Sequence, residues 1–158
     1  MRLAEREIKD KRLMNRVLAS NGVVTLAMSR DNQPYLVTVN YAYDQKPRHL
    51  YFHSASSGKK LDYLAANHTV WGQVMEDMGY IEGKCDYSYR TVQFLGEAGE
   101  VLDPSEKILA LTMMIEKFDH DSERMKERLL RKGKLEKVKV LRVKILEMTG
   151  KESLPRKP

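Results

Sequence analysis

The sequence predicts a mainly β fold, in which antiparallel strands are interrupted by a few helical insertions. Short runs rich in Val, Thr, Tyr and Phe alternate with clusters of turn residues, as in strands joined by tight turns. Helical patterns occur only a few times and do not follow each strand, so a parallel βαβ sheet is not indicated. Two glycines inside one long β-rich run, Gly96 and Gly99, indicate the bend or bulge that a closing barrel requires.

The length and composition fit one globular domain. The 158 residues allow one domain with its own core and are too few for two ordinary ones, so residues 1–158 are taken as a single domain. No apolar run approaches the ~20 residues of a membrane-spanning helix. The first ten residues mix both charges and lack the apolar segment of a secretory signal, so we expect a cytoplasmic protein.

The N-terminal third predicts one helix followed by three strands. Residues 2–19, within an N-terminal segment 1–20, have a helical pattern that ends at Ser20-Asn21-Gly22. Its expected buried positions are Ile8, Leu13, Val17 and Leu18. Residues 22–29 and 35–43 are β-rich and joined by a polar turn, which predicts a hairpin, and residues 49–53 predict a third strand.

The middle of the chain predicts a short helix and two further strands. Residues 58–66 have helical character, and residues 69–78 form a β-rich run with large apolar side chains. Residues 90–102 form the next such run. Between the two runs, residues 79–88 combine two glycines, Asp86 and nearby tyrosines, which is the composition of a loop.

The C-terminal third predicts two helices and a last strand. At the first helix Asp103 can cap, Pro104 fits the first helical position and Glu106 sits at the third. The helix runs toward Phe118, and residues 122–131 predict a second, amphipathic helix before a break at Gly133. In residues 137–145 cations alternate with apolar residues, as in a strand with one wet face. The polar tail, residues 151–158, is expected to be partly disordered.

Residues 50–62, with the sequence LYFHSASSGKKLD, carry the most informative motif. A strand-like segment gives way to hydroxylated residues, a glycine and two lysines where a helix is predicted to begin. The hydroxyl donors are Ser54, Ser56 and Ser57. Gly58 permits close backbone approach, Lys59 and Lys60 add positive charge, and the helix N-terminus offers free N–H groups to a phosphate. Serine-glycine turns followed by solvated lysines also occur in proteins that bind nothing, and no Walker or G-x-G-x-x-G motif is present.

Four stretches, in order, resemble the pyridoxamine 5′-phosphate oxidase-like split-barrel flavoproteins, particularly the branch with the nitroimidazole-resistance proteins. These stretches are residues 22–41, 50–62, 89–98 and 143–152. The resemblance covers most of the chain, about residues 10–152. It implies an antiparallel, homodimeric split β-barrel that binds flavin mononucleotide (FMN) at the dimer interface.

The resemblance also implies roles for individual residues. By position, the flavin ring and ribityl chain would be faced by Val37, Thr38, Val39 and Asn40. The phosphate end would be held by His53, Ser54, Gly58 and Lys59, with Lys60 ranked below Lys59, and Arg90 and Thr91 would meet the cofactor from a later strand. His53 is the candidate catalytic residue, because a histidine at this position lies close to the flavin in that branch. Without a flavin, Val37 and Val39 would be plain core residues and His53 a structural histidine.

The function implied by the resemblance is that of an FMN-dependent oxidoreductase. It would pass electrons from a reduced nicotinamide, or another donor, to a small organic acceptor such as a nitroaromatic. A non-catalytic flavin-binding protein for storage or sensing would use the same site and stays open, as does haem binding with His53 or His68 as ligand. Vitamin B6 oxidation is not expected, because the C-terminal tryptophan and arginine set of those oxidases has no counterpart and Gly58 stands where they have a phosphate-binding arginine.

The charge distribution raises one further alternative. Residues 124–158 contain thirteen Lys or Arg and four Asp or Glu, a net +9 that leaves −3 for the first 123 residues. Nucleic-acid binding would use Lys137, Lys139, Arg142 and Lys144, but no nucleic-acid-binding motif accompanies them and a solvated strand face is the simpler interpretation. Cys85 is the only cysteine, so an internal disulfide is excluded, and we expect it to be a packed residue. The four histidines have no metal-ligand spacing.

Overall fold

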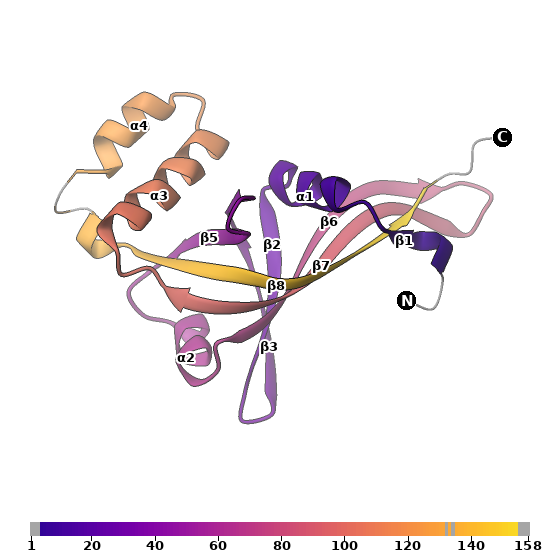
Figure 1. Ribbon diagram of the computed structural model, residues 1–158, viewed down its shortest axis with the longest axis horizontal. Helices are drawn as coiled ribbons and strands as arrows, with labels where there is room; N and C mark the ends of the chain where they lie inside the picture. The colour runs from indigo at the N-terminus through magenta and orange to yellow at the C-terminus, as the bar shows by residue number, and fades with distance from the viewer. Residues whose placement is uncertain (1–3, 132, 134, 155–158) are drawn as a thin grey trace.

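The computed structural model describes residues 4–131, 133 and 135–154, and within these residues eight strands form one antiparallel sheet with helices around it (Figure 1). The strands are β1 (Glu7–Ile8), β2 (Val23–Arg30), β3 (Gln33–Asn40), β4 (Ala42–Asp44), β5 (His49–Ser54), β6 (Thr69–Ile81), β7 (Asp86–Glu100) and β8 (Lys139–Ser153). The helices are α1 (Lys11–Ser20), α2 (Lys59–Ala66), α3 (Pro104–Phe118) and α4 (Ser122–Leu129), with 3₁₀ turns η1 (Ala4–Arg6) and η2 (Leu135–Lys137). None of these helices is long and apolar enough to cross a membrane.

The sheet curls into a barrel with one seam. Its strand order is β3-β2-β6-β7-β8-β5-β4, with β1 added on β8, so β3 and β4 are the two ends of the hydrogen-bonded path. Yet β3 ends at Asn40 and β4 begins at Ala42. The two ends must therefore meet at Tyr41, whose side chain is fully buried and donates a hydrogen bond of 2.6 Å to the carbonyl oxygen of Leu18 in α1.

Close packing inside the barrel depends on glycines where strands meet bulky neighbours. Gly72 of β6 lies opposite Phe94 of β7, and a Cβ at residue 72 would collide with the phenyl ring. Gly96 faces Val143 of β8 in the same way, at the point where the β7–β8 register shifts and Leu146 becomes the extra residue. The bulge predicted from the glycines of this strand is confirmed at Gly96.

Three of the four helices begin with an aspartate cap. Asp10 accepts a hydrogen bond from the Arg12 N–H in α1, Asp103 from the Glu106 N–H in α3, and Asp121 from the Arg124 N–H in α4. The predicted start of α3 is thereby confirmed. Helix α2 differs: Gly58 precedes it with φ of 140°, and no side chain caps it. Two hydrophobic cores result, one inside the barrel and a smaller one where α3 packs on β4 and β5.

Two predicted elements are wrong in extent. The N-terminal helix was predicted over residues 2–19, but Asp10 starts α1 at Lys11, and Ile8 is buried as a strand residue that pairs with Gly150 instead. The loop predicted at 79–88 is a continuation of the β6–β7 hairpin on both sides of a turn at residues 82–85, where Cys85 is exposed and not packed. The first error comes from pairing with the distant strand β8, and the second arises because hairpin pairing continues past the glycines, with Tyr80 opposite Tyr87 and Ile81 opposite Asp86.

Smaller differences concern strand ends. The strand predicted at 35–43 is divided into β3 and β4 at the seam. In the tail, β8 extends to Ser153, so residues 151–153 are ordered by pairing with β7. Residues 1–3 and 155–158, on which parts of the helix and tail predictions fall, lie outside the described residues, as does the side chain of Lys137.

Candidate functional site

The outward side of the sheet, away from the barrel interior, carries a polar row that crosses five strands. Strand pairing places Thr38 opposite Thr25, Thr25 opposite Gln73, Gln73 opposite Gln93 and Gln93 opposite Thr149. Directly opposite residues of an antiparallel sheet share one face, so the five side chains form a continuous strip. We call this side of β3, β2, β6, β7 and β8, centred on the row Thr38–Thr25–Gln73–Gln93–Thr149, the outer face.

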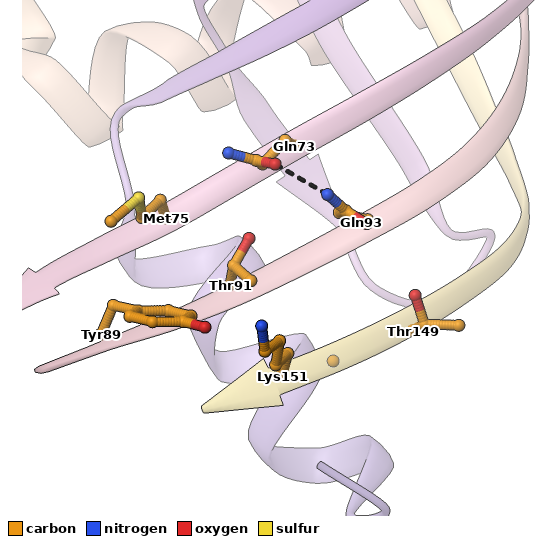
Figure 2. A pocket seen from close by; sticks show the side chains of 8 residues that line it. Gln73, Met75, Tyr89, Thr91, Gln93, Thr149 and Lys151 are labelled. Carbon is orange, nitrogen blue, oxygen red and sulfur yellow. Dashed lines mark hydrogen bonds between the residues drawn. The ribbon is translucent and has the colours of Figure 1, made fainter. Parts of the chain in front are cut away.

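Hydrogen bonds order the side chains of this row. The hydroxyl oxygens of Thr25 and Thr38 lie 3.1 Å apart, and the amide nitrogen of Gln93 donates to the amide oxygen of Gln73 at 2.8 Å. Figure 2 shows the glutamine pair, with Thr91 and Thr149 on the neighbouring positions. Each glutamine keeps further donor and acceptor capacity, because a primary amide has two N–H donors and two acceptor lone pairs.

The rows on either side of the polar strip differ, because one is apolar and the other mixes apolar and polar side chains. One consists of Leu36, Ala27, Trp71 and Leu95, and the other of Met75, Thr91 and Lys151. Leu36 on β3 is 66% exposed and Trp71 on β6 is 51% exposed, which is unusual for large apolar side chains in one row of a sheet. The outer face therefore offers amide and hydroxyl groups beside an apolar row that contains Leu36 and Trp71.

Two cavities lie on the outer face. The first, of about 450 Å³, lies over β6, β7 and β8 and is bordered by Met75, Tyr89, Thr91 and Lys151 (Figure 2). The second, of about 300 Å³, lies over β2 and β6 beside Trp71. Both are also lined by Gln73 and Gln93, so they adjoin at the polar row. Their combined shape and lining suit a planar heteroaromatic ring with several polar edges.

The predicted ring-facing stretch of β3 is split between two sides of the sheet. Val39 is buried in the barrel core and Val37 packs against it, so these side chains point away from the outer face. Thr38 and Asn40 alternate with them and point outward. Because β3 ends the strand order, its backbone N–H and C=O groups on the free side have no strand partner among the described residues.

Apart from His53, the predicted phosphate residues lie between the end of β5 and the start of α2. Ser54 is buried, with 6% of its surface exposed. Among the described residues, its hydroxyl oxygen is the one buried side-chain N or O atom without a hydrogen-bond partner. The first helical hydrogen bonds of α2 come from Leu61 and Asp62, both to the Gly58 carbonyl oxygen. The N–H groups of the first turn, at Lys59 and Lys60, are therefore free for a ligand.

The lysines of this turn differ in their surroundings. Lys59 is exposed, and its ammonium nitrogen lies 4.6 Å from the ring centre of Tyr35 and 5.6 Å from that of Tyr63. This cation–π contact holds the charge near the start of α2. Lys60 is half-buried, and neither lysine forms an ion pair within the described part of the chain. The orphaned hydroxyl, the uncapped helix start and the ammonium group are each chemically suited to a phosphate.

His53 lies on a different side of the molecule from the outer face. It is exposed and pairs with Val140 of β8. Because it is two residues from Tyr51, it lies on the same side of β5 as Tyr51, the side that α3 covers. With Asn40 it lines a cleft of about 450 Å³ between the barrel and the helices α3 and α4. Asn40 thus belongs both to the outward side of β3 and to this cleft.

The side chains of Arg90 and Thr91 lie on opposite sides of β7. The Thr91 hydroxyl lies on the outer face and donates to the carbonyl oxygen of Val74 at 3.1 Å. Arg90 points to the opposite side, where its guanidinium lies 2.9 Å from Glu152 and 3.7 Å from Glu76. Of the predicted residues, the structure therefore places Thr38 and Thr91 on the outer face, Asn40 and His53 at the cleft, and Ser54, Gly58, Lys59 and Lys60 at the start of α2.

Sequence reasoning missed Gln73, Gln93 and Thr149. The signal for the first was present, because residues 70–75 alternate Val70, Gly72 and Val74 inward with Trp71, Gln73 and Met75 outward. The alignment of five distant strands was not visible in the sequence. No cluster of three His, Cys, Asp or Glu that could hold a metal ion occurs in residues 4–131, 133 or 135–154.

Lys117 and Tyr51 are two of the groups near α3 that have shifted pKa values. Burial lowers the pKa of Lys117 from 10.5 to about 8; its ammonium group donates to the carbonyl oxygen of Asn21 and lies 4.2 Å from the Tyr41 ring centre. Burial, with a hydrogen bond to Glu106, raises the pKa of Tyr51. Neither residue lines the outer face or the cleft, so both shifts belong to the packing of α3.

Comparison with known proteins gives matches to one protein family and to many solved structures. A family model described as pyridoxamine 5′-phosphate oxidase matches residues 10–152. A crystal structure of a candidate 5-nitroimidazole antibiotic resistance protein from Bacteroides thetaiotaomicron aligns with a TM-score of 0.75 and 24% identity, over 92% of this chain and 86% of that one. No curated protein sequence matches.

Two further solved structures carry ligand-binding names. A FAD-binding protein from Mesorhizobium loti aligns with a TM-score of 0.69 and 25% identity, over 94% of this chain and 98% of that one. A FAD- and haem-binding protein from Mycobacterium smegmatis aligns with a TM-score of 0.78 at 16% identity, over 95% and 74%. At such identities the likeness establishes a shared fold, and the split barrel expected from the sequence is confirmed.

Proposed function

Because the chain belongs to the pyridoxamine 5′-phosphate oxidase family, we propose that it binds a flavin, FMN, and uses it to reduce a small organic acceptor. Support comes from the names of the structural relatives, two of which bind FAD and one of which is a candidate nitroimidazole-resistance protein. The observation that carries the proposal is the outer face, where the row from Thr38 to Thr149 presents amides and hydroxyls beside the apolar row of Leu36, Ala27, Trp71 and Leu95.

The outer face would hold the flavin ring. The amides of Gln73 and Gln93 and the hydroxyls of Thr38 and Thr91 supply donors and acceptors for the polar edge of the ring, while Trp71 and Met75 supply apolar contact. This assignment keeps Thr38 and Thr91 from the sequence-based set. Val37 and Val39 would support the site only through the β3 backbone.

The start of α2 would hold the phosphate. Free first-turn N–H groups and the positive end of the helix dipole favour an anion there, and Gly58 adds no side chain that would block it. Ser54 has an unused hydroxyl donor, and Lys59 adds a charge that no described carboxylate neutralises.

The second part of the proposal is a homodimer whose partner covers the outer face. In one chain the outer-face cavity over β2 and β6 is open to solvent along Leu36 and Trp71. A second copy would bury these side chains and exclude water from the ring site, which strengthens every hydrogen bond made there. When bound, the flavin supplies the redox chemistry, and the protein positions it and controls access.

The visible spectrum of freshly purified protein, before and after addition of FMN, tests the proposal. We expect flavin absorbance that remains with the protein through gel filtration, and extraction followed by chromatography distinguishes FMN from FAD. A protein that stays colourless with excess FMN, or that shows a Soret band in place of flavin absorbance, would contradict it.

Lys59→Ala tests the phosphate assignment. Loss of one charge-assisted contact should weaken FMN binding about tenfold, corresponding to ~1.4 kcal/mol, in a fluorescence titration. Lys46→Ala, which removes an exposed lysine from the turn after β4, serves as the control and should leave the dissociation constant unchanged. Equal losses in both variants would mean that the effect is one of net charge only.

A non-catalytic flavin-binding role is the second candidate, and the position of His53 favours it. His53, the catalytic candidate, lies at the cleft and not among the residues that line the outer-face cavities. Reduction of the bound flavin by NADH or NADPH, followed by reoxidation with nitroaromatic acceptors, separates the two. A tightly bound flavin that no donor reduces would leave binding as the function.

A further inference from the structure

The cleft beneath α3 and α4 has the features of a small-molecule site of its own. Its volume is about 450 Å³, within the range of ligand pockets. Helix α3 forms one wall with Leu111 and Phe118, α4 and η2 form the other with Leu129 and Leu135, and the ends of β3 and β5 form the floor. Figure 1 shows the two helices as a hairpin beside β5 and the start of β8.

Apolar side chains of the cleft stay partly exposed in the free protein. Phe118 is 43% exposed and Leu129 38% exposed, although both lie against a concave surface. Helix α4 buries none of its residues, so its own packing does not cover Leu129. A ligand in the cleft would remove this hydrophobic area from water, at ~25 cal/mol per Å².

The polar groups of the cleft are few and lie mainly on its floor. Asn40 and His53 offer hydrogen bonds there, and Asp119 follows the end of α3. Asp119 is the only charged side chain among the described residues that line the cleft, although the whole chain carries a net charge of +6. Such a lining disfavours phosphorylated or carboxylated ligands and favours uncharged ones.

We propose that this cleft binds a small, uncharged aromatic molecule with one polar substituent that hydrogen-bonds Asn40 and His53. The cleft is a site separate from the proposed flavin site, since none of the described residues that line it borders either outer-face cavity.

Equilibrium dialysis with 1-naphthol, an uncharged aromatic alcohol, tests the binding in protein without added flavin. We expect one site per chain. Leu129→Gln should weaken binding about five- to tenfold, because it replaces apolar contact with a polar side chain. Leu109→Gln is the matched control: Leu109 is also an exposed helical leucine but lies outside the cleft lining, and this variant should bind within about twofold of the wild type.

Two ligand comparisons sharpen the test. 1-Naphthoate, which has the same rings and a carboxylate, should bind at least about tenfold more weakly than 1-naphthol. His53→Ala should reduce 1-naphthol affinity roughly fivefold by removing a hydrogen-bonding group. No saturable binding of 1-naphthol, equal affinities in the Leu129→Gln and Leu109→Gln variants, or tighter binding of 1-naphthoate would each overturn the proposal.

FMN titration of the same variants separates the cleft from the proposed flavin site. Leu129→Gln should leave FMN affinity unchanged, because Leu129 borders neither outer-face cavity. A protein that binds 1-naphthol but no FMN would reject the flavin function and keep the cleft. A protein that binds FMN but not 1-naphthol would do the reverse.

Discussion

At the scale of single residues, the barrel depends on positions where the absence of a side chain is essential. Gly72 has the Phe94 ring in the space that its Cβ would occupy, and both are buried. Gly99 lies in a strand as well, but nothing lies within 4 Å of a Cβ built there. A substitution at Gly72 therefore tests overpacking of the core, whereas the same substitution at Gly99 tests the change in backbone freedom alone.

We expect Gly72→Ala to lower the free energy of unfolding by about 1–3 kcal/mol, because the Phe94 ring must move in a closely packed core. Gly99→Ala, the control, should leave it unchanged or raise it by up to ~1 kcal/mol, because alanine restricts the unfolded chain. Urea unfolding measures both. Equal effects would show that Phe94 moves aside without cost.

Lys117 makes the stability depend on pH. Burial lowers its pKa to about 8 in the folded protein, against 10.5 for an exposed lysine. Below pH ~8 the ammonium is charged in both states, and its burial disfavours the folded one. Between pH ~8 and ~10 the unfolded chain holds a proton that the folded protein has released, so the free energy of unfolding rises with pH.

The measurement is urea unfolding from pH ~8 to ~9.5, below the range where the tyrosines titrate. The wild type should become more stable over this interval. Lys117→Met should remove most of that rise, whereas Lys126→Met, which affects an ion-paired lysine at the surface, should keep it. A rise of the same size in the Lys117→Met protein would assign the effect to another group.

At the scale of secondary-structure elements, one carboxylate fastens α3 to the barrel. Glu106 accepts hydrogen bonds from the Tyr51 hydroxyl at 2.9 Å and from the Arg142 guanidinium at 2.8 and 3.0 Å, so it joins α3 to β5 and β8. His49 lies 3.1 Å from the same hydroxyl. The smaller hydrophobic core lies beside this network.

Glu106→Gln should lower the free energy of unfolding by about 1–3 kcal/mol, because it breaks charged hydrogen bonds in a partly buried place. Glu100→Gln, which breaks the more exposed pair with Lys139, should cost at most ~1 kcal/mol. Thermal or urea unfolding of the two variants provides the comparison. A cost for Glu106→Gln no larger than for Glu100→Gln would show that hydrophobic contacts alone hold α3.

The elements that sequence reasoning predicted well are those with local signals. Asp103, Pro104 and Glu106 are adjacent, and their capping chemistry placed the start of α3 correctly. The β6–β7 hairpin was shortened to a loop, because Gly79 and Gly83 resemble turn residues although strand pairing continues past the bulge before Tyr80. Glu7 and Ile8, which were predicted to be helical, form a strand because they pair with the distant strand β8.

At the scale of the whole molecule, the candidate site is a property of the register of the sheet. The polar row joins Thr25 and Thr38 near the N-terminus to Thr149 near the C-terminus. The candidate phosphate residues could be named from the sequence because they lie within residues 50–62, whereas the row requires four strand pairings to be known together. A shift of one residue in the register of any of these pairings would break the row, because the shifted strand would point those side chains into the barrel interior.

Charges at this scale reduce the case for a nucleic-acid surface. Of the four cations considered for that role, Lys139 pairs with Glu100 and Arg142 with Glu106, while the side chain of Lys137 lies outside the described residues. Paired cations release fewer counterions on binding a phosphate backbone.

Association through the outer face gives the last prediction. Trp71→Glu should convert the proposed dimer to monomer, with a dissociation constant raised at least roughly a hundredfold, because it places a charge at the centre of an apolar row. Leu102→Glu changes a leucine that is 82% exposed elsewhere, and it should leave the association unchanged. Sedimentation velocity measures both. A dimer that persists in Trp71→Glu would move the interface to another surface.

The barrel should open most easily at the seam between β3 and β4, which meet at Tyr41. Strands β3 and β4 are bonded on one side only, whereas β7 and β8 are bonded on both, so amide hydrogens of β3 should exchange with deuterium sooner than those at the centre of the sheet. A molecule or a second chain that binds along β3 would complete the wall there. Slower deuterium uptake by residues 33–40, with uptake in β7 unchanged, would then show that binding protects the free side of β3.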